Sequence, residues 1–136
     1  MVSADKELVS DVVTCVTPAL LPRLEEFKEF LYSLGVRHWR LFTIFPVGRA
    51  ATDPSLQLND EEFTFVMQFI EKCRKEGRVM ASYGCEGFLG GYEMRARQNP
   101  FECHAGVGVA SIRVNGDISG CTSVRANFTQ GNIYKD

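Results

Sequence analysis

Two cysteines enclose a glycine-rich stretch near the end of the sequence, CHAGVGVASIRVNGDISGC, which begins at Cys103 and ends at Cys121. Such a pair can form a disulfide, hold a metal together, or have no joint role. The chain has five cysteines in total, an odd number that cannot be fully paired, and we expect a reducing compartment that disfavours disulfides. Metal binding, reactivity or simple burial must therefore explain each cysteine.

The residues between these two cysteines predict a β-hairpin. Asn115 and Gly116 are a strong signal for a two-residue type I′ turn, because both central positions of that turn need a positive φ. This turn would place Ala110 opposite Cys121. Cys103 then precedes the paired region, so a direct cross-strand disulfide is disfavoured, whereas binding of both thiols to one metal stays open.

The other three cysteines have weaker signals. Cys15 lies in an apolar run and Cys73 on the apolar face of a predicted helix, and we expect both to be small core residues. Cys85 lies in a glycine-rich loop beside Glu86, whose carboxylate opposes thiolate formation. Cys85 is therefore better explained as a third cluster ligand than as a nucleophile. A role as a buried structural thiol explains it better than either. His104, beside Cys103, is a possible metal ligand, but an exposed surface position explains it better.

Hydrophobic patterns predict the elements that position these residues. Apolar, β-branched-rich runs predict strands at 11–16, 38–45 and 78–83, and the first of these should be buried on both faces. Apolar residues at intervals of three and four predict one helix between Thr17 and Gly35, with a buried stripe at Leu20, Leu24, Phe27, Leu31 and Leu34. A second helix is predicted from a capping-box start at Asn59 and Glu62 to Gly77, with a stripe at Phe63, Val66, Ile70 and Cys73.

Strands that alternate with helices in this way are typical of right-handed βαβ units. The sequence therefore predicts an α/β protein: the edge of a partial parallel (β/α) barrel with about three strands and two main helices, followed by an antiparallel β-hairpin. A glycine-rich and then charged segment after residue 83 connects the two parts and contains a short predicted helix.

Three segments resemble one known family. Cys103, twelve intervening residues, Gly116, four further residues and Cys121 match the opening of the SPASM domain, the auxiliary iron–sulfur domain of many radical SAM enzymes. WRLFTIFPVGRA, from Trp39, resembles a strand and Pro-x-Gly-Arg-Ala loop late in the barrel of such enzymes, and FTQGNIY, from Phe128, resembles the phrase after the cysteine hairpin. The resemblance implies a partial barrel over residues 1–91, and a linker with the truncated start of a SPASM domain over residues 92–136.

The resemblance implies a part of an iron–sulfur oxidoreductase that modifies a peptide or protein, with 4Fe-4S clusters and S-adenosylmethionine as cofactors of the intact enzyme. Cys103 and Cys121 would be two of the metal ligands. The sequence lacks the Cys-x-x-x-Cys-x-x-Cys loop that holds the radical-generating cluster and stops before the other SPASM cysteines. We therefore expect this chain alone to be inactive and to bind no cofactor. The alternative is a non-catalytic α/β module that binds a partner or a metal and shares ancestry with the family.

Three residues at the predicted carboxyl ends of the strands are candidate ligands of S-adenosylmethionine, where parallel barrels collect their chemistry. Arg49 offers a planar fork suited to the carboxylate of that cofactor, although an ion pair with Asp53 explains the residue equally well. Thr17 and Ser82 offer hydroxyls, which helix capping and strand termination explain as well.

Composition excludes several other classes of function. The net charge of −2, with no basic run, argues against a nucleic-acid partner. No apolar run reaches membrane-spanning length and the start lacks the pattern of a signal peptide, so we expect a cytoplasmic protein without a membrane partner. Unpaired strand edges in a partial barrel lead us to expect self-association of this chain.

Overall fold

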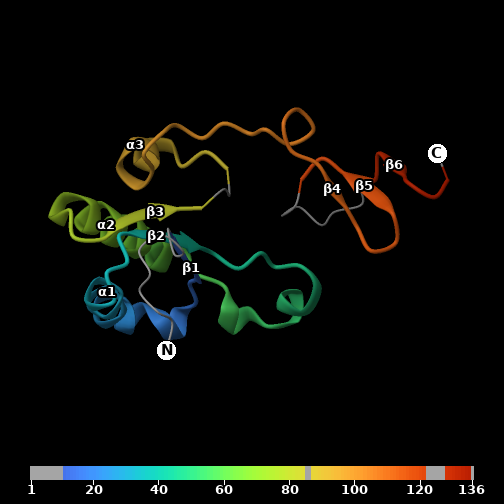
Figure 1. Ribbon diagram of the computed structural model, residues 1–136. Helices are drawn as coiled ribbons and strands as arrows, with labels where there is room; N and C mark the ends of the chain where they lie inside the picture. Colours follow the sequence, from blue (N-terminus) through green and yellow to red (C-terminus); the bar gives the residue numbers. More distant parts are fainter. Residues whose placement is uncertain (1–10, 85–86, 122–127, 136) are drawn as a thin grey trace. The chain divides into compact units, whose positions relative to one another are not determined.

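The computed structural model of the protein describes residues 11–84, 87–121 and 128–135. The chain divides into two units, Met1–Phe101 and Glu102–Asp136, each of which is described by itself (Figure 1). The division follows Phe101, whereas the sequence suggested one after residue 91. The reason is that η4 (Gly90–Tyr92) and α3 (Glu93–Ala96) belong to the first unit, where Ala96 is fully buried in the core.

The first unit contains a three-stranded parallel sheet in the order β1-β2-β3. Its strands are β1 (Val12–Cys15), β2 (His38–Phe42) and β3 (Met80–Tyr83). The parallel α/β prediction is confirmed, but β2 is shorter than the predicted 38–45. It ends where its neighbours end, because beyond that point it has no strand on either side to accept or donate ladder hydrogen bonds.

The first crossover consists of the 3-10 turn η1 (Pro18–Arg23) and the helix α1 (Leu24–Ser33). The sequence predicted one continuous helix here. Pro22 has no N–H to donate to the preceding turn, so regular α-helical hydrogen bonding begins only after it. Leu34 was expected on the buried stripe, but it lies beyond the last turn of α1 and is 44% exposed. Gly35 ends the helical segment as predicted, with a φ of 79°.

The second crossover ends in the long helix α2 (Asp60–Glu76), which follows two 3-10 turns, η2 (Gly48–Thr52) and η3 (Pro54–Leu56). The predicted capping box is present. The Glu62 N–H donates to Asn59 Oδ1 at 2.9 Å, and the Asn59 N–H donates to Glu62 Oε2 at 2.9 Å. None of the helices in the described ranges has the length and apolar character needed to cross a lipid bilayer.

Both crossover helices cover the same face of the parallel sheet. Trp39, the largest buried side chain, lies in β2 and packs its ring edge to face with Phe69 and Phe27, at centroid distances of 5.8 and 5.5 Å. Its Nε1–H donates to Thr14 Oγ1 at 2.9 Å. The buried core consists of Val16, Leu24, Leu31, Trp39, Leu41, Val66, Met67, Phe69, Ile70, Cys73, Val79, Ala81, Tyr83 and Ala96.

The opposite face of the sheet is open in the described part of the first unit. Side chains alternate between the two faces along a strand, and most of those pointing away from the helices are exposed: Val13, Cys15, His38, Arg40 and Met80. The predictions that the first strand is buried on both faces and that Cys15 is a core residue are therefore wrong, because no helix among the described residues of this unit covers this side of β1.

Arginine side chains close the outer edge of β3. Arg74 Nη1 donates to the Ala81 carbonyl at 3.2 Å, and Arg97 Nη2 donates to the Gly84 carbonyl at 2.7 Å. Glu93 holds Arg97 in place through contacts of 2.8 and 3.0 Å to Nη1. The carbonyls of Ala81 and Gly84 on this edge thus accept from guanidinium groups, and the self-association expected from unpaired strand edges stays a prediction.

The second unit contains an antiparallel sheet in the order β4-β5-β6. Its strands are β4 (Ser111–Ile112), β5 (Asp117–Ser119) and β6 (Gly131–Asn132). The predicted hairpin is present as β4 and β5. The third strand, β6, was not predicted, because a strand of two residues has no periodicity that a sequence could show.

Candidate functional site

The hairpin of the second unit is closed by a three-residue loop. Ile112 lies opposite Ile118, and the Arg113 N–H donates to the Asp117 carbonyl at 2.9 Å. Gly116 has a φ of 84°, and its N–H donates to the Arg113 carbonyl at 2.9 Å. This is a turn followed by a glycine in the left-handed region, a standard three-residue hairpin loop.

The predicted two-residue type I′ turn is therefore wrong, and the register differs by one residue from the one that would set Ala110 opposite Cys121. A type I′ turn needs a positive φ at Asn115 as well as at Gly116, and among the described residues only glycines have one. Asn115 instead uses its side chain in the turn, where Oδ1 accepts from the Asp117 N–H at 3.2 Å.

The segment from Gly131 to Tyr134 packs against this turn and forms hydrogen bonds with it. Asn132 is buried, and its Nδ2 donates to the Asn115 carbonyl at 3.1 Å and to Asp117 Oδ1 at 2.8 Å. These amide donors, Asn132 first and Asn115 second, lower the pKa of Asp117. A Cβ on Gly116 would lie 2.4 Å from the Tyr134 ring. The glycine is thus required both by its φ and by the close approach of Tyr134.

The two cysteine-bearing segments meet at the open end of the hairpin. The Gly106 N–H donates to the Gly120 carbonyl at 3.0 Å, and a Cβ on Gly120 would lie 3.1 Å from the Gly106 nitrogen. Between Cys103 and the hairpin the chain makes a tight loop in which three N–H groups, those of Val107, Gly108 and Val109, donate to the His104 carbonyl. The segment after Cys103 therefore folds back onto the residue before Cys121.

Both cysteines of this unit are thiols in the structure. Cys103 is exposed, and Cys121 is half-buried with a carbonyl that accepts from Ser119 Oγ at 3.1 Å. His104 is exposed and lies 3.8 Å from Glu102 Oε2. Within the described ranges no three His, Cys, Asp or Glu side chains are grouped closely enough to hold a metal. Two thiols fit the chemistry of an iron–sulfur site but supply only half of the usual four ligands.

The second unit has no apolar core among its described residues. Only Gly116, Ser119 and Asn132 are buried in it. Large apolar side chains are instead exposed, with Val114 fully in solvent and Val107 at 89% exposure. Units of fewer than about 40 residues usually need disulfides, metals or a partner for stability. Among its described residues, turn geometry and polar hydrogen bonds hold this unit together.

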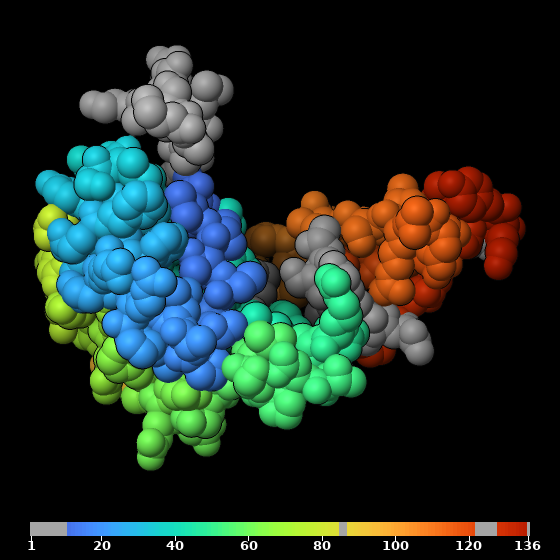
Figure 2. All heavy atoms as spheres, turned by 90° about the horizontal axis from the view of Figure 1, so that it is seen from below, coloured from blue at the N-terminus to red at the C-terminus, as the bar shows by residue number. Residues whose placement is uncertain are grey.

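The three predicted ligands of S-adenosylmethionine lie at different places in the first unit. Thr17 is half-buried, directly before η1, and makes no side-chain capping bond. Arg49 is exposed in η2, and Figure 2 shows the segment from Gly48 to Leu56 at the molecular surface. The alternative partner of Arg49, Asp53, instead accepts from the Ser55 N–H and hydroxyl, at 3.1 and 2.6 Å.

Ser82 is not at a strand end but inside β3, opposite Arg40, on the open face of the sheet. It lines a pocket of about 490 Å³ together with His38 and Arg40. Thr17 and Arg49 do not line this pocket, so the structure does not gather the three residues around one cavity.

The remaining cysteines differ in their surroundings. Cys73 is fully buried in the core, as predicted, and burial raises the pKa of its thiol to about 12. Such a thiol stays protonated at neutral pH and is chemically inert. Cys85 lies outside the described residues.

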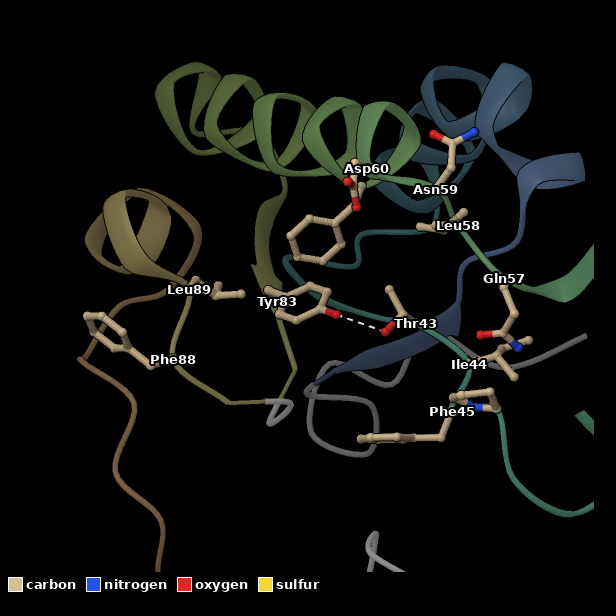
Figure 3. Close-up of a pocket in the computed structure, with 12 residues that line it drawn as sticks. Thr43, Ile44, Phe45, Gln57, Leu58, Asn59, Asp60, Tyr83, Phe88 and Leu89 are labelled. Atoms are coloured by element: carbon tan, nitrogen blue, oxygen red, sulfur yellow. Dashed lines mark hydrogen bonds between the residues drawn. The ribbon is translucent and has the colours of Figure 1, made fainter. Parts of the chain in front are cut away.

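A second pocket, of about 520 Å³, was not predicted. It lies beyond the carboxyl ends of β2 and β3, and its lining includes Phe45, Asp60, Tyr83 and Phe88 (Figure 3). These residues come from separate elements and share no motif. The aromatic residues of the two loops were the only available signal, and aromatic side chains alone do not distinguish a pocket from a core.

No protein-family model, curated protein or solved structure matches the chain.

Proposed function

We propose that this chain is part of a radical SAM enzyme that modifies a peptide or protein, and that Cys103 and Cys121 are thiolate ligands of an auxiliary 4Fe-4S cluster. The observation that carries the proposal is the meeting of the two cysteine-bearing segments, through Gly106 and Gly120, at one end of a hairpin whose unit has no apolar core among its described residues. A cluster bound there supplies redox chemistry or a substrate contact, and the protein supplies the thiolates and their spacing.

The lack of buried apolar side chains in the described part of the second unit supports a bound metal centre there. The exposed valines of this unit and its two exposed isoleucines, Ile112 and Ile133, contribute little hydrophobic stabilisation. In small domains of this kind, the binding free energy of a metal becomes part of the folding free energy. Gly116, Asn132 and Tyr134 contact one another at the turn that sets the hairpin register. These contacts give a physical reason why a glycine at this spacing and the FTQGNIY segment, both of which resemble the SPASM pattern, occur together.

The first unit supports the barrel part of the proposal. In a (β/α) barrel the helices lie outside and the other face of the sheet lines the interior, and here both crossover helices cover one face while Val13, Arg40 and Met80 are exposed on the other. Arginines close the outer edge of β3, as expected for a last strand. The outer edge of β1 would then pair with a preceding strand of the intact barrel.

Arg49 is the best supported of the proposed ligands of S-adenosylmethionine. It is exposed in the loop after β2 and forms no ion pair with another described residue, so its guanidinium is available for a bidentate contact to a carboxylate. Thr17, which follows β1, stays a secondary candidate. Ser82 is the weakest of the three, because its side chain shares a pocket with residues at the amino ends of the strands.

The first test is the coding sequence on either side of this chain. We expect a Cys-x-x-x-Cys-x-x-Cys loop upstream and a cysteine-rich run downstream. The absence of both would contradict the proposal.

The second test is the iron content of the protein encoded by the whole reading frame, purified without oxygen. We expect Cys103→Ala and Cys121→Ala each to lose about four irons, one cluster, and to keep the others. Cys15→Ala is the matched control, since Cys15 is also an exposed thiol but lies on the sheet of the first unit. Unchanged iron in both hairpin variants would remove the ligand assignment.

A further inference from the structure

The 520 Å³ pocket of the first unit is lined by apolar side chains together with the polar side chains of Thr43, Gln57, Asn59 and Asp60. Pockets of this size hold small molecules, and their polar groups set the orientation of the ligand. It lies where β2 and β3 end and α2 begins, a place at which parallel α/β sheets bind ligands. The described residues that line this pocket are separate from the cysteine-bearing hairpin of the proposed function.

Aromatic rings form the walls of this pocket. The Phe63 and Tyr83 rings pack edge to face at 5.6 Å, and the Tyr83 hydroxyl is hydrogen-bonded to Thr43 Oγ1 at 2.9 Å (Figure 3). Phe88 is 71% exposed and Phe45 is 42% exposed. Apolar rings exposed at the rim of a cavity can contact a ligand that enters it. A ring presents a negative face, so several rings around one space attract a cation.

Asp60 gives the pocket its charge. It is the only charged residue among the described residues that line the cavity. Its neighbours Asn59 and Glu62 bind each other in the capping box, whereas the Asp60 carboxylate has no hydrogen bond or ion pair with any other described residue. The positive end of α2 would favour an anion here, but the Asn59 cap and three acidic residues in the first turn of α2 offset it.

We propose that this pocket binds an organic cation, an ammonium group that carries an apolar alkyl or aryl body. The ammonium lies near the Asp60 carboxylate, and the apolar body contacts Phe63, which follows Asp60 in the first turns of α2. A bare metal ion does not fit, because one carboxylate cannot replace the several oxygen ligands that such ions need. The site is independent of the proposed cluster function, since Phe63 and Tyr83 belong to the helix-covered side of the sheet.

The probes that test this are phenethylammonium and its uncharged counterpart 2-phenylethanol, titrated into the ¹⁵N-labelled chain and followed by amide chemical shifts. We expect shifts at Leu58, Phe63 and Leu89, and roughly fivefold tighter binding of the cation than of the alcohol. Nα-acetyl-lysine methylamide then distinguishes the source of the ammonium: tighter binding of this compound indicates a lysine side chain of a polypeptide, and weaker binding indicates a free amine.

Two variants separate the site from general charge effects. Asp60→Asn should remove most of the preference for the cation over the alcohol. Glu61→Gln is the matched control, because it removes the same charge from the same helical turn without lining the pocket, and it should keep that preference. Phe63→Leu keeps an apolar side chain but removes the ring, and it should weaken binding of the cation at least twofold. Equal binding of cation and alcohol, equal effects of the two acidic variants, or no shifts at the pocket would each overturn the proposal.

Discussion

The two units of this chain are built in different ways. The described part of the first buries fourteen apolar side chains, Trp39 among them, whereas the described part of the second buries only a glycine, a serine and an asparagine. Side-chain packing therefore determines the first unit, and turn geometry with hydrogen bonds determines the second. The comparison predicts that the first unit withstands the loss of a surface group, whereas the second depends on individual turn residues.

The largest effect is expected from Trp39→Ala in the first unit. Trp39 is fully buried between Phe27 and Phe69, so its removal should cost about 3–5 kcal/mol in the free energy of unfolding. Urea denaturation followed by far-ultraviolet circular dichroism measures this without the lost tryptophan signal. The control is Val114→Ala in the second unit, where a side chain fully exposed to solvent should change the same quantity by less than about 0.5 kcal/mol. Similar losses in the two variants would contradict the contrast between the units.

The second effect concerns the closed edge of β3 and depends on pH. Burial opposes the charged form of Glu93, but donors from Leu89, Arg97 and Phe101 together lower its pKa below the ordinary value of 4.5. Because the folded pKa is lower than the unfolded one, the stabilisation is complete above about pH 4.5. It is lost as the pH falls through the folded pKa.

Glu93→Gln tests this at neutral and acidic pH. At neutral pH the variant should lose about 2–3 kcal/mol, since Arg97 keeps a buried charge without its carboxylate partner. Below pH 4 the difference between wild type and variant should shrink. A difference that is constant between pH 7 and pH 3 would show that the pair is not ionised in the folded protein.

The third effect tests the turn of the second unit. Gly116→Ala forces a Cβ into the left-handed region and against the Tyr134 ring, so it should cost about 1–2 kcal/mol. Tyr134 is 74% exposed and can yield, which limits the cost. The measurement is the loss of cross-strand amide contacts between Ile112 and Ile118 in NMR spectra. Gly108→Ala is the control, because its nearest neighbour would be 3.8 Å away and it has no positive φ. Equal losses would mean that the turn does not set the hairpin.

The same contrast explains how far the sequence predicts the structure. In the first unit the apolar period, the capping box at Asn59 and the stop at Gly35 predict the elements, because burial and helix ends leave local patterns. The error at Cys15 arose because a run of apolar residues does not reveal whether a second layer covers a strand. The role of Arg97 at the edge of β3 was not predictable, because the backbone carbonyls of Gly84 and Gly87 that accept from it leave no pattern in the sequence.

In the second unit the sequence predicts the hairpin but misses its register by one residue. Asn115-Gly116 fits both a two-residue type I′ turn and the three-residue loop that forms. The choice between them depends on Asn132, which lies later in the chain and donates hydrogen bonds to Asn115 and Asp117. The aromatic pocket was missed for a similar reason, because Phe45, Asp60 and Phe88 come together only after folding.

The smallest effect is expected from the cysteines that suggested the function. Without added metal, Cys103→Ala and Cys121→Ala should each change the stability of this chain by less than about 0.5 kcal/mol, because the described residues hold no complete metal site that a variant could lose. The measurement is the urea midpoint of the hairpin amide signals. A loss above about 1 kcal/mol at Cys121, which is half-buried beside Ser119, would mean that its thiol packs as a structural group. A second measurement adds iron and sulfide to the three proteins under anaerobic conditions. If the hairpin is the start of a cluster site, the hairpin amide signals of the wild type should shift, and those of both variants should not. The amide signals of the first unit should stay unchanged in all three proteins.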